Sequence, residues 1–81
     1  MGNGMIPLGS LRPGERAQVA SLMQDNPTIR RLAESGLLPG THVQLVRRAP
    51  FKDPLEIRLR GYCITLRRAD ANQIMVRKDA P

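Results

Sequence analysis

NPTIRRLAESGLLPGTHVQLV, residues 26–46, predicts a short helix, a helix stop, a tight turn and a strand in one run. Asn26 is suited to the N-cap, because its side-chain oxygen can accept a hydrogen bond from a free amide of the first helical turn. Pro27 suits the first helical position, where the missing N–H has no intrahelical partner to lose. Three apolar side chains at i, i+3 and i+4 give this helix one apolar face: Ile29, Leu32 and Ala33.

Glycines mark both the end of this helix and the turn after it. Gly36 stands where a left-handed C′ residue ends a helix, and Leu37 stands where a Schellman ending places an apolar contact. Pro39 and Gly40 then predict a type II turn, because Pro presets φ at the second position and Gly accepts a positive φ at the third. From Thr41 the apolar period changes to two, which indicates a strand.

The remainder of the chain repeats this alternation of turns and short strands. Arg12-Pro13-Gly14-Glu15 is a second Pro-Gly turn, and Gly61 predicts a tight connection between two alternating segments. The polar stretch 68–73 predicts a single helical or 3₁₀ turn. Period-two alternation predicts five strands, at residues 16–22, 41–47, 55–60, 62–67 and 74–76. The turns depend on Pro13, Gly14, Gly36, Pro39, Gly40 and Gly61.

Five short strands with one helix inserted after the first predict a mainly β protein built as a small barrel. Closure would remove sheet edges that so small a sheet would otherwise leave unpaired. We expect three parts: a flexible N-terminal segment at residues 1–10, the folded domain at 11–77 and a C-terminal tail at 78–81.

Composition narrows the class of protein. The 81 residues suffice for one small domain, and a content of 41% hydrophobic but 2% aromatic residues predicts an aliphatic core. The net charge of +6 suits nucleic acid, an anionic membrane surface or an acidic protein face, without choosing among them. A single cysteine excludes an internal disulfide and fits a cytoplasmic location. No apolar run approaches the roughly 20 residues of a membrane span, so we expect no membrane insertion.

The densest chemical feature is a set of arginines around a loop stiffened by two prolines, residues 48–54. A solvated charged face is one interpretation of this set. The other is a partner contact, because the planar guanidinium fork suits carboxylates, and it also suits a nucleic-acid backbone. Phe51 at the loop tip is either an interface anchor or a lid folded onto the barrel, and Tyr62 belongs to the core or the barrel lip. The arginines are Arg47, Arg48, Arg58, Arg60, Arg67 and Arg68.

Catalysis and metal binding have weaker support. With one His and one Cys, the chain shows no Ser-His-Asp ordering and no Gly-rich phosphate loop, so we do not expect an enzyme. The potential ligands fall on different predicted strands and loops, and a complete metal site would need several of them or a second subunit. The alternative is an exposed His and a thiol that acts as a small hydrophobe. The candidate ligands are His42, Asp53, Glu56 and Cys63.

The order and spacing of these motifs resemble the FeoA family of small accessories to bacterial ferrous iron transport. The resemblance covers about residues 11–77, and Lys52 departs from it because the family's loop commonly has Gly there. The matching motifs are Leu11-x-Pro13-Gly14-Glu15-x-Ala17-x-Val19, Arg31-Leu32-x-x-x-Gly36-Leu37-x-Pro39-Gly40-Thr41-x-Val43, Arg48-Ala49-Pro50-Phe51-x-Asp53-Pro54 and Gly61-Tyr62-x-Ile64-x-Leu66-Arg67.

The resemblance implies an SH3-like barrel that binds a partner and needs no cofactor, with a divalent metal and a homodimer left open. The implied partner is the cytosolic G-protein domain of a FeoB-type ferrous iron transporter, which would hold this cytoplasmic adaptor at the inner membrane. We expect the contact to use Arg47, Arg48, Phe51, Arg58 and Arg60. The rival interpretation is a small nucleic-acid-binding barrel, against which the scarcity of aromatic residues argues, because such modules stack bases on aromatic rings.

Overall fold

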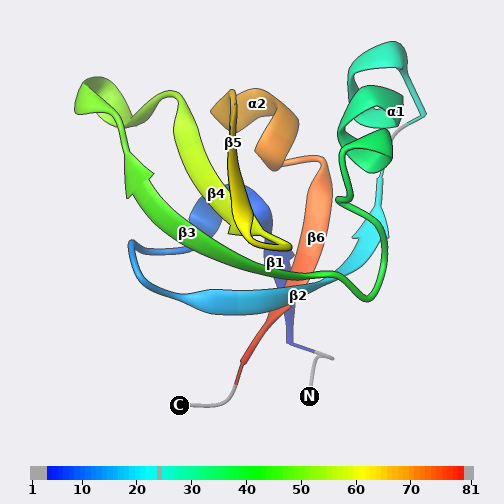
Figure 1. The fold of residues 1–81 in the computed structure, drawn as a ribbon, viewed down its shortest axis with the longest axis horizontal. Helices are drawn as coiled ribbons and strands as arrows, with labels where there is room; N and C mark the ends of the chain where they lie inside the picture. Colours follow the sequence, from blue (N-terminus) through cyan, green and yellow to red (C-terminus); the bar gives the residue numbers. More distant parts are fainter. Residues whose placement is uncertain (1–3, 24, 80–81) are drawn as a thin grey trace.

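Six antiparallel strands form one strongly curved sheet in the computed structural model, which describes residues 4–23 and 25–79 (Figure 1). The strand order is β1-β6-β2-β3-β4-β5. The strands are β1 (Met5–Pro7), β2 (Arg16–Leu22), β3 (His42–Arg48), β4 (Leu55–Leu59), β5 (Tyr62–Leu66) and β6 (Ile74–Lys78). The helical elements are α1 (Pro27–Glu34), α2 (Arg68–Ala71) and the 3₁₀ turns η1 (Leu8–Ser10) and η2 (Pro50–Lys52). No helix among these residues is long and apolar enough to cross a bilayer.

Helix α1 begins and ends as its sequence predicts. The Asn26 side chain accepts a hydrogen bond of 2.9 Å from the amide of Ile29, and Pro27 is the first helical residue. At the other end Gly36 has a φ of 115°. The Leu37 amide donates to the Leu32 carbonyl (3.1 Å), and the Gly36 amide donates to the Ala33 carbonyl (2.9 Å). These two bonds are the pair that defines a Schellman ending.

The two Pro-Gly turns are also confirmed. Thr41 donates to the Leu38 carbonyl (3.0 Å) and Glu15 donates to the Arg12 carbonyl (2.9 Å), which closes each turn. The glycine before each donor has a positive φ, as a type II turn requires. Each turn leads directly into a strand, and because β2 and β3 are antiparallel the two turns lie at opposite ends of this pair. The five predicted strands agree with β2 to β6 within two residues at each end.

Strand β1 is a sixth strand that the sequence analysis missed. Met5, Ile6 and Pro7 pair with β6, and Leu8 immediately after them is fully buried. The expectation of a flexible segment over residues 1–10 therefore differs from the structure at residues 5–10, while residues 1–3 lie outside the described residues. Three residues that include a proline show no alternation, so the pairing with β6, about 70 positions later, has no local signal.

The core is aliphatic, as the composition predicts, and fills the inside of the curved sheet. The barrel is nevertheless partly open, because β1 and β5 are the two ends of the sheet and no ladder joins them within residues 4–23 and 25–79. The expected full closure is thus absent from the described part of the chain. The buried residues are Leu8, Leu11, Ala17, Val19, Ile29, Leu37, Val43, Leu45, Leu55, Ile57, Leu59, Leu66, Ala71, Ile74 and Val76.

Candidate interaction surface

The loop between β3 and β4, residues 49–54, is held firmly at its base. The Ala49 amide donates to the Pro54 carbonyl at 3.0 Å, which closes the loop where the two strands meet it. A carboxylate oxygen of Asp53 accepts a hydrogen bond of 2.9 Å from the amide of Arg68, the first residue of α2. The loop is therefore tied to its own strands and to the segment after β5, and its tip projects from a fixed base (Figure 1).

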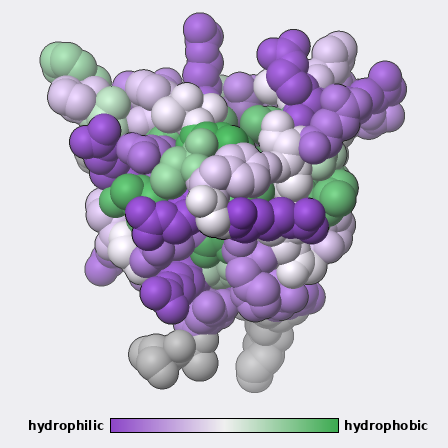
Figure 2. All heavy atoms as spheres, viewed as in Figure 1, coloured by the Kyte–Doolittle hydropathy of each residue, from purple (hydrophilic) through white to green (hydrophobic). Residues whose placement is uncertain are grey.

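Phe51 lies at this tip and is 100% exposed. The lid interpretation is therefore wrong for this structure, since a lid would bury the ring against the barrel. Phe51 also has a φ of 69°, a left-handed backbone conformation that is uncommon for a bulky residue. In Figure 2 the tip over η2, at the upper left, shows hydrophobic colour away from the body of the molecule. The Lys52 side chain, where the loop departs from the family's pattern, lies outside those the structure describes.

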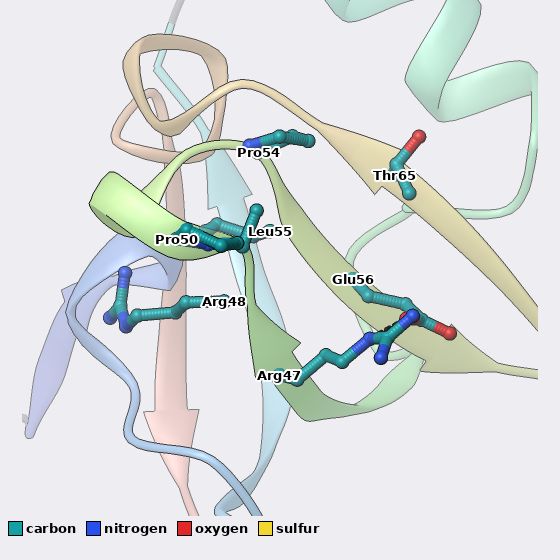
Figure 3. A pocket seen from close by; sticks show the side chains of 8 residues that line it. Arg47, Arg48, Pro50, Pro54, Leu55, Glu56 and Thr65 are labelled. Carbon is teal, nitrogen blue, oxygen red and sulfur yellow. Dashed lines mark hydrogen bonds and ion pairs between the residues drawn. The ribbon is translucent and has the colours of Figure 1, made fainter.

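A shallow pocket of about 280 Å³ lies beneath the loop (Figure 3). Arg47 and Glu56 lie opposite each other on β3 and β4 and form an ion pair of 2.8 Å across its wall. Exposed pairs of this kind add little to stability, so both side chains can exchange partners at low cost. The pocket is lined by Arg47, Arg48, Ala49, Pro50, Pro54, Leu55, Glu56 and Thr65.

Arg48 differs from the sequence prediction, because its guanidinium bonds within the fold. One nitrogen donates to the carbonyls of Gly9 (2.6 Å) and Leu11 (2.5 Å), two residues that are themselves buried. Figure 3 shows the side chain reaching away from the pocket toward the N-terminal segment. Arg48 therefore joins the end of β3 to the segment after β1, and we remove it from the predicted contact surface.

Arg58 and Arg60 are both exposed but lie away from the Phe51 tip, toward the turn that joins β4 to β5. They line an open depression of about 420 Å³ together with Arg16 and His42. Arg60 and Gly61 have φ values of 50° and 82°, as a two-residue type I′ hairpin turn requires. The predicted contact residues thus divide into Arg47 and Phe51 at the long loop, and Arg58 and Arg60 at the short turn.

The short turn packs beneath the end of α1. The Tyr62 hydroxyl donates to the carbonyl of Ser35, the C-cap of the helix. A Cβ atom added at Gly36 would lie 3.2 Å from Leu59 Cδ1 and 3.4 Å from the Tyr62 hydroxyl, so the space there is tight, and the φ of 115° favours glycine in addition. Tyr62 remains 44% exposed, which places it at the barrel lip as predicted.

The four candidate metal ligands are not brought together. His42 and Cys63 are exposed on β3 and β5, Asp53 accepts from the α2 amide, and Glu56 pairs with Arg47. Within residues 4–23 and 25–79 there is no group of three His, Cys, Asp or Glu side chains that could hold a metal ion. The role of Asp53 could not be read from the sequence, because its partner amide is 15 positions away.

Hydrogen bonds lower the pKa values of two carboxylates outside this surface. A hydrogen bond from Lys78, with a second from the Arg12 amide, lowers the pKa of Glu15. The hydrogen bond from Arg30 lowers the pKa of Asp25 and raises that of the arginine. Both acids are therefore charged at neutral pH and satisfied by neighbours on the chain.

Comparison with known proteins gives one consistent family. Residues 6–78 match the FeoA domain family. The Fe(2+) transport protein A/Fe(2+) transporter FeoB fusion protein of Porphyromonas gingivalis is 32% identical over 69 residues. These residues are 85% of this chain but 8% of the fusion protein, so the chain spans a small part of its curated relative.

Two solved structures extend the match to the fold. The FeoA protein of Chlorobium tepidum has a TM-score of 0.87 and 36% identity, over 93% of this chain and 71% of that chain. The FeoA of Stenotrophomonas maltophilia, solved with zinc and described as a procaryotic SH3 domain protein, has a TM-score of 0.74 and 27% identity, over 85% of this chain and 86% of that chain. The predicted SH3-like, mainly β fold is thereby confirmed, and the chain belongs to the FeoA family of ferrous iron transport proteins.

Proposed function

We propose that the chain is a cytoplasmic binding module that attaches to the cytosolic G-protein region of a FeoB-type ferrous iron transporter and modulates uptake. The observation that carries the proposal is the fusion relative, in which a segment like this chain shares one polypeptide with a FeoB transporter. Two domains joined in one chain are held at high effective concentration, which favours direct contact between them. The transporter, rather than this chain, would handle iron and nucleotide.

The exposure and the restraint of the Phe51 loop support its proposed role in contacting the transporter. A fully exposed aromatic ring gains from burial in a partner, and interface hot spots are enriched in such anchors. Pro50, Pro54 and the Asp53 bond to α2 restrain the loop before binding, which lowers the ordering cost on association. Arg47 stands beside the loop with an exposed guanidinium, and its weak ion pair with Glu56 can be exchanged at low cost for a carboxylate of the partner.

The test is a binding titration between the whole chain and the purified cytosolic region of the transporter. Phe51→Ala should weaken binding by about 2 kcal/mol, as expected for the loss of an anchor. Met23→Ala is the matched control, because Met23 is also a large exposed hydrophobic residue (59%) but lies directly after β2, outside the loop. Equal affinity of both variants and the parent would contradict the proposed contact.

Two further titrations test whether the chain needs a metal for this contact and whether it binds nucleic acid. Because no metal enters the proposed contact, a chelator should leave the affinity unchanged. Single-stranded RNA and duplex DNA at physiological salt should bind weakly and without sequence preference, since the net charge of +6 acts without a stacking platform. Tight, sequence-dependent binding would instead support the nucleic-acid-binding alternative.

A further inference from the structure

Strand β5 is an open sheet edge. It pairs with β4 along its whole length, from Leu59↔Tyr62 to Leu55↔Leu66, and no ladder is found on its other side within residues 4–23 and 25–79. In a two-residue hairpin the two residues that flank the turn, here Leu59 and Tyr62, form a hydrogen-bonded pair. Further along the strands, non-hydrogen-bonded and hydrogen-bonded pairs alternate. Cys63 and Thr65 therefore direct their N–H and C=O groups away from β4, toward the open side.

The edge lacks the features that usually protect one. Natural edges carry charged residues, proline or bulges, which discourage the addition of another strand. At the opposite edge, β1 has three residues, includes Pro7 and runs directly into η1. Tyr62–Leu66 instead has the sequence YCITL, without charge or proline, and its register with β4 has no bulge. The geometry of β5 is thus ready to accept a strand.

The inside of the sheet is incompletely covered beside this edge. The inward residues of β4, Leu55, Ile57 and Leu59, are all buried, whereas Ile64 on β5 is only half-buried although it lies opposite Ile57. Figure 2 shows neutral and hydrophobic surface over β5, with strongly hydrophilic side chains around it. An added strand with an apolar inward residue would complete the cover of Ile64.

The positive charge around the edge of β5 determines which kind of added strand would fit. Arg58 lies opposite Cys63, Arg60 is in the turn before β5, and Arg67 follows it on the same outward face as Thr65. None of the three has an acidic partner within the described ranges, and the nearby Glu56 is already paired with Arg47. We propose that the open edge of β5 binds an extended acidic segment of a partner protein as an added strand, with outward carboxylates alternating with an inward apolar residue.

This edge is separate from the Phe51 loop, so the inference does not depend on the transporter contact. The probe is the peptide Ac-Glu-Val-Glu-Val-Glu-amide, titrated by NMR into the ¹⁵N-labelled whole chain with a reductant that keeps Cys63 as a thiol. The amide signals of Cys63 and Thr65 should shift and become protected from exchange. Phe51→Ala should bind this peptide like the parent, which distinguishes a failure here from a failure of the proposed function.

Thr65→Pro removes an N–H from the open side, and proline is tolerated where an edge N–H faces solvent. It should lower peptide affinity at least tenfold, whereas Thr65→Val, which keeps the N–H, should not. If Thr65→Pro fails to fold, a peptide N-methylated at alternate amides must show the same loss on the parent chain. Equal binding by Ac-Lys-Val-Lys-Val-Lys-amide, shifts confined to residues 49–54, no binding, or edge-dependent self-association in place of peptide binding would each overturn the proposal.

Discussion

Two hairpins share β4, and each contains one non-glycine residue with a positive φ: Phe51 in the β3–β4 loop and Arg60 in the β4–β5 turn. At the short turn the left-handed residue serves the fold, because Gly61 follows it and the strands close beneath the end of α1. At the long loop the left-handed residue contacts nothing and points its ring into solvent. Strain that serves no packing motivates a hypothesis of function, so the comparison sets a structural hairpin against the hairpin for which we propose a binding role.

The largest effect should come from Gly36→Val at the end of α1, where the glycine packs against the structural hairpin. Valine there would combine a disfavoured φ of 115° with a Cβ only 3.2 Å from Leu59 Cδ1. Strain and overpacking together predict a loss of about 4 kcal/mol in the free energy of unfolding, measured by chemical denaturation. Gly40→Val is the control, because its φ is 95° but nothing lies within 4 Å of the added Cβ. It should lose about 2 kcal/mol from strain alone. Equal losses would show that the close packing beneath α1 contributes nothing.

Arg48→Met should give the next largest effect and tests the anchoring of the long loop. Methionine keeps the length of the side chain but loses both bonds to the Gly9 and Leu11 carbonyls. Hydrogen bonds from a charged donor to buried acceptors predict a loss of about 2 kcal/mol in the free energy of unfolding. Arg47→Met, the exposed neighbour, should lose less than about 1 kcal/mol. A reversed order would return Arg48 to the contact surface and make Arg47 the structural residue.

These residues also show what the sequence can and cannot predict. The cap at Asn26, the stop at Gly36 and the turn at Gly40 depend on partners within five positions, so their residue types were sufficient evidence. Arg48 bonds carbonyls 37 and 39 positions away, and nothing in its neighbourhood distinguishes it from Arg47. The exposure of Phe51 was likewise undecided, because a loop tip can point outward or fold back over the barrel.

Arg60→Asn should have a smaller effect of the opposite sign. Asparagine tolerates the left-handed region better than arginine does, and Asn-Gly is the favoured type I′ turn pair. We expect a gain of about 0.5 kcal/mol in the free energy of unfolding, in the range typical of single stabilising surface changes. Arg58→Asn removes the same charge from within β4, where asparagine is disfavoured, and should not stabilise. A loss in the Arg60 variant would mean that its side chain supports the turn beneath Gly36.

The smallest effect on stability should come from Phe51→Ala. An unchanged free energy of unfolding here would show that the long loop, unlike the short turn, does not pack against the fold. The ring is 100% exposed, so its removal takes no apolar surface out of the core, and surface changes of this kind stay within about 0.5 kcal/mol. Ile57→Ala, on the strand that both hairpins share, is the contrast: it empties a fully buried site and should cost about 2–5 kcal/mol. If Phe51→Ala instead lowered stability as a buried aromatic does, the ring would be packed against the barrel in solution. The long loop would then be a second structural hairpin, and its left-handed residue would need no binding partner to explain it.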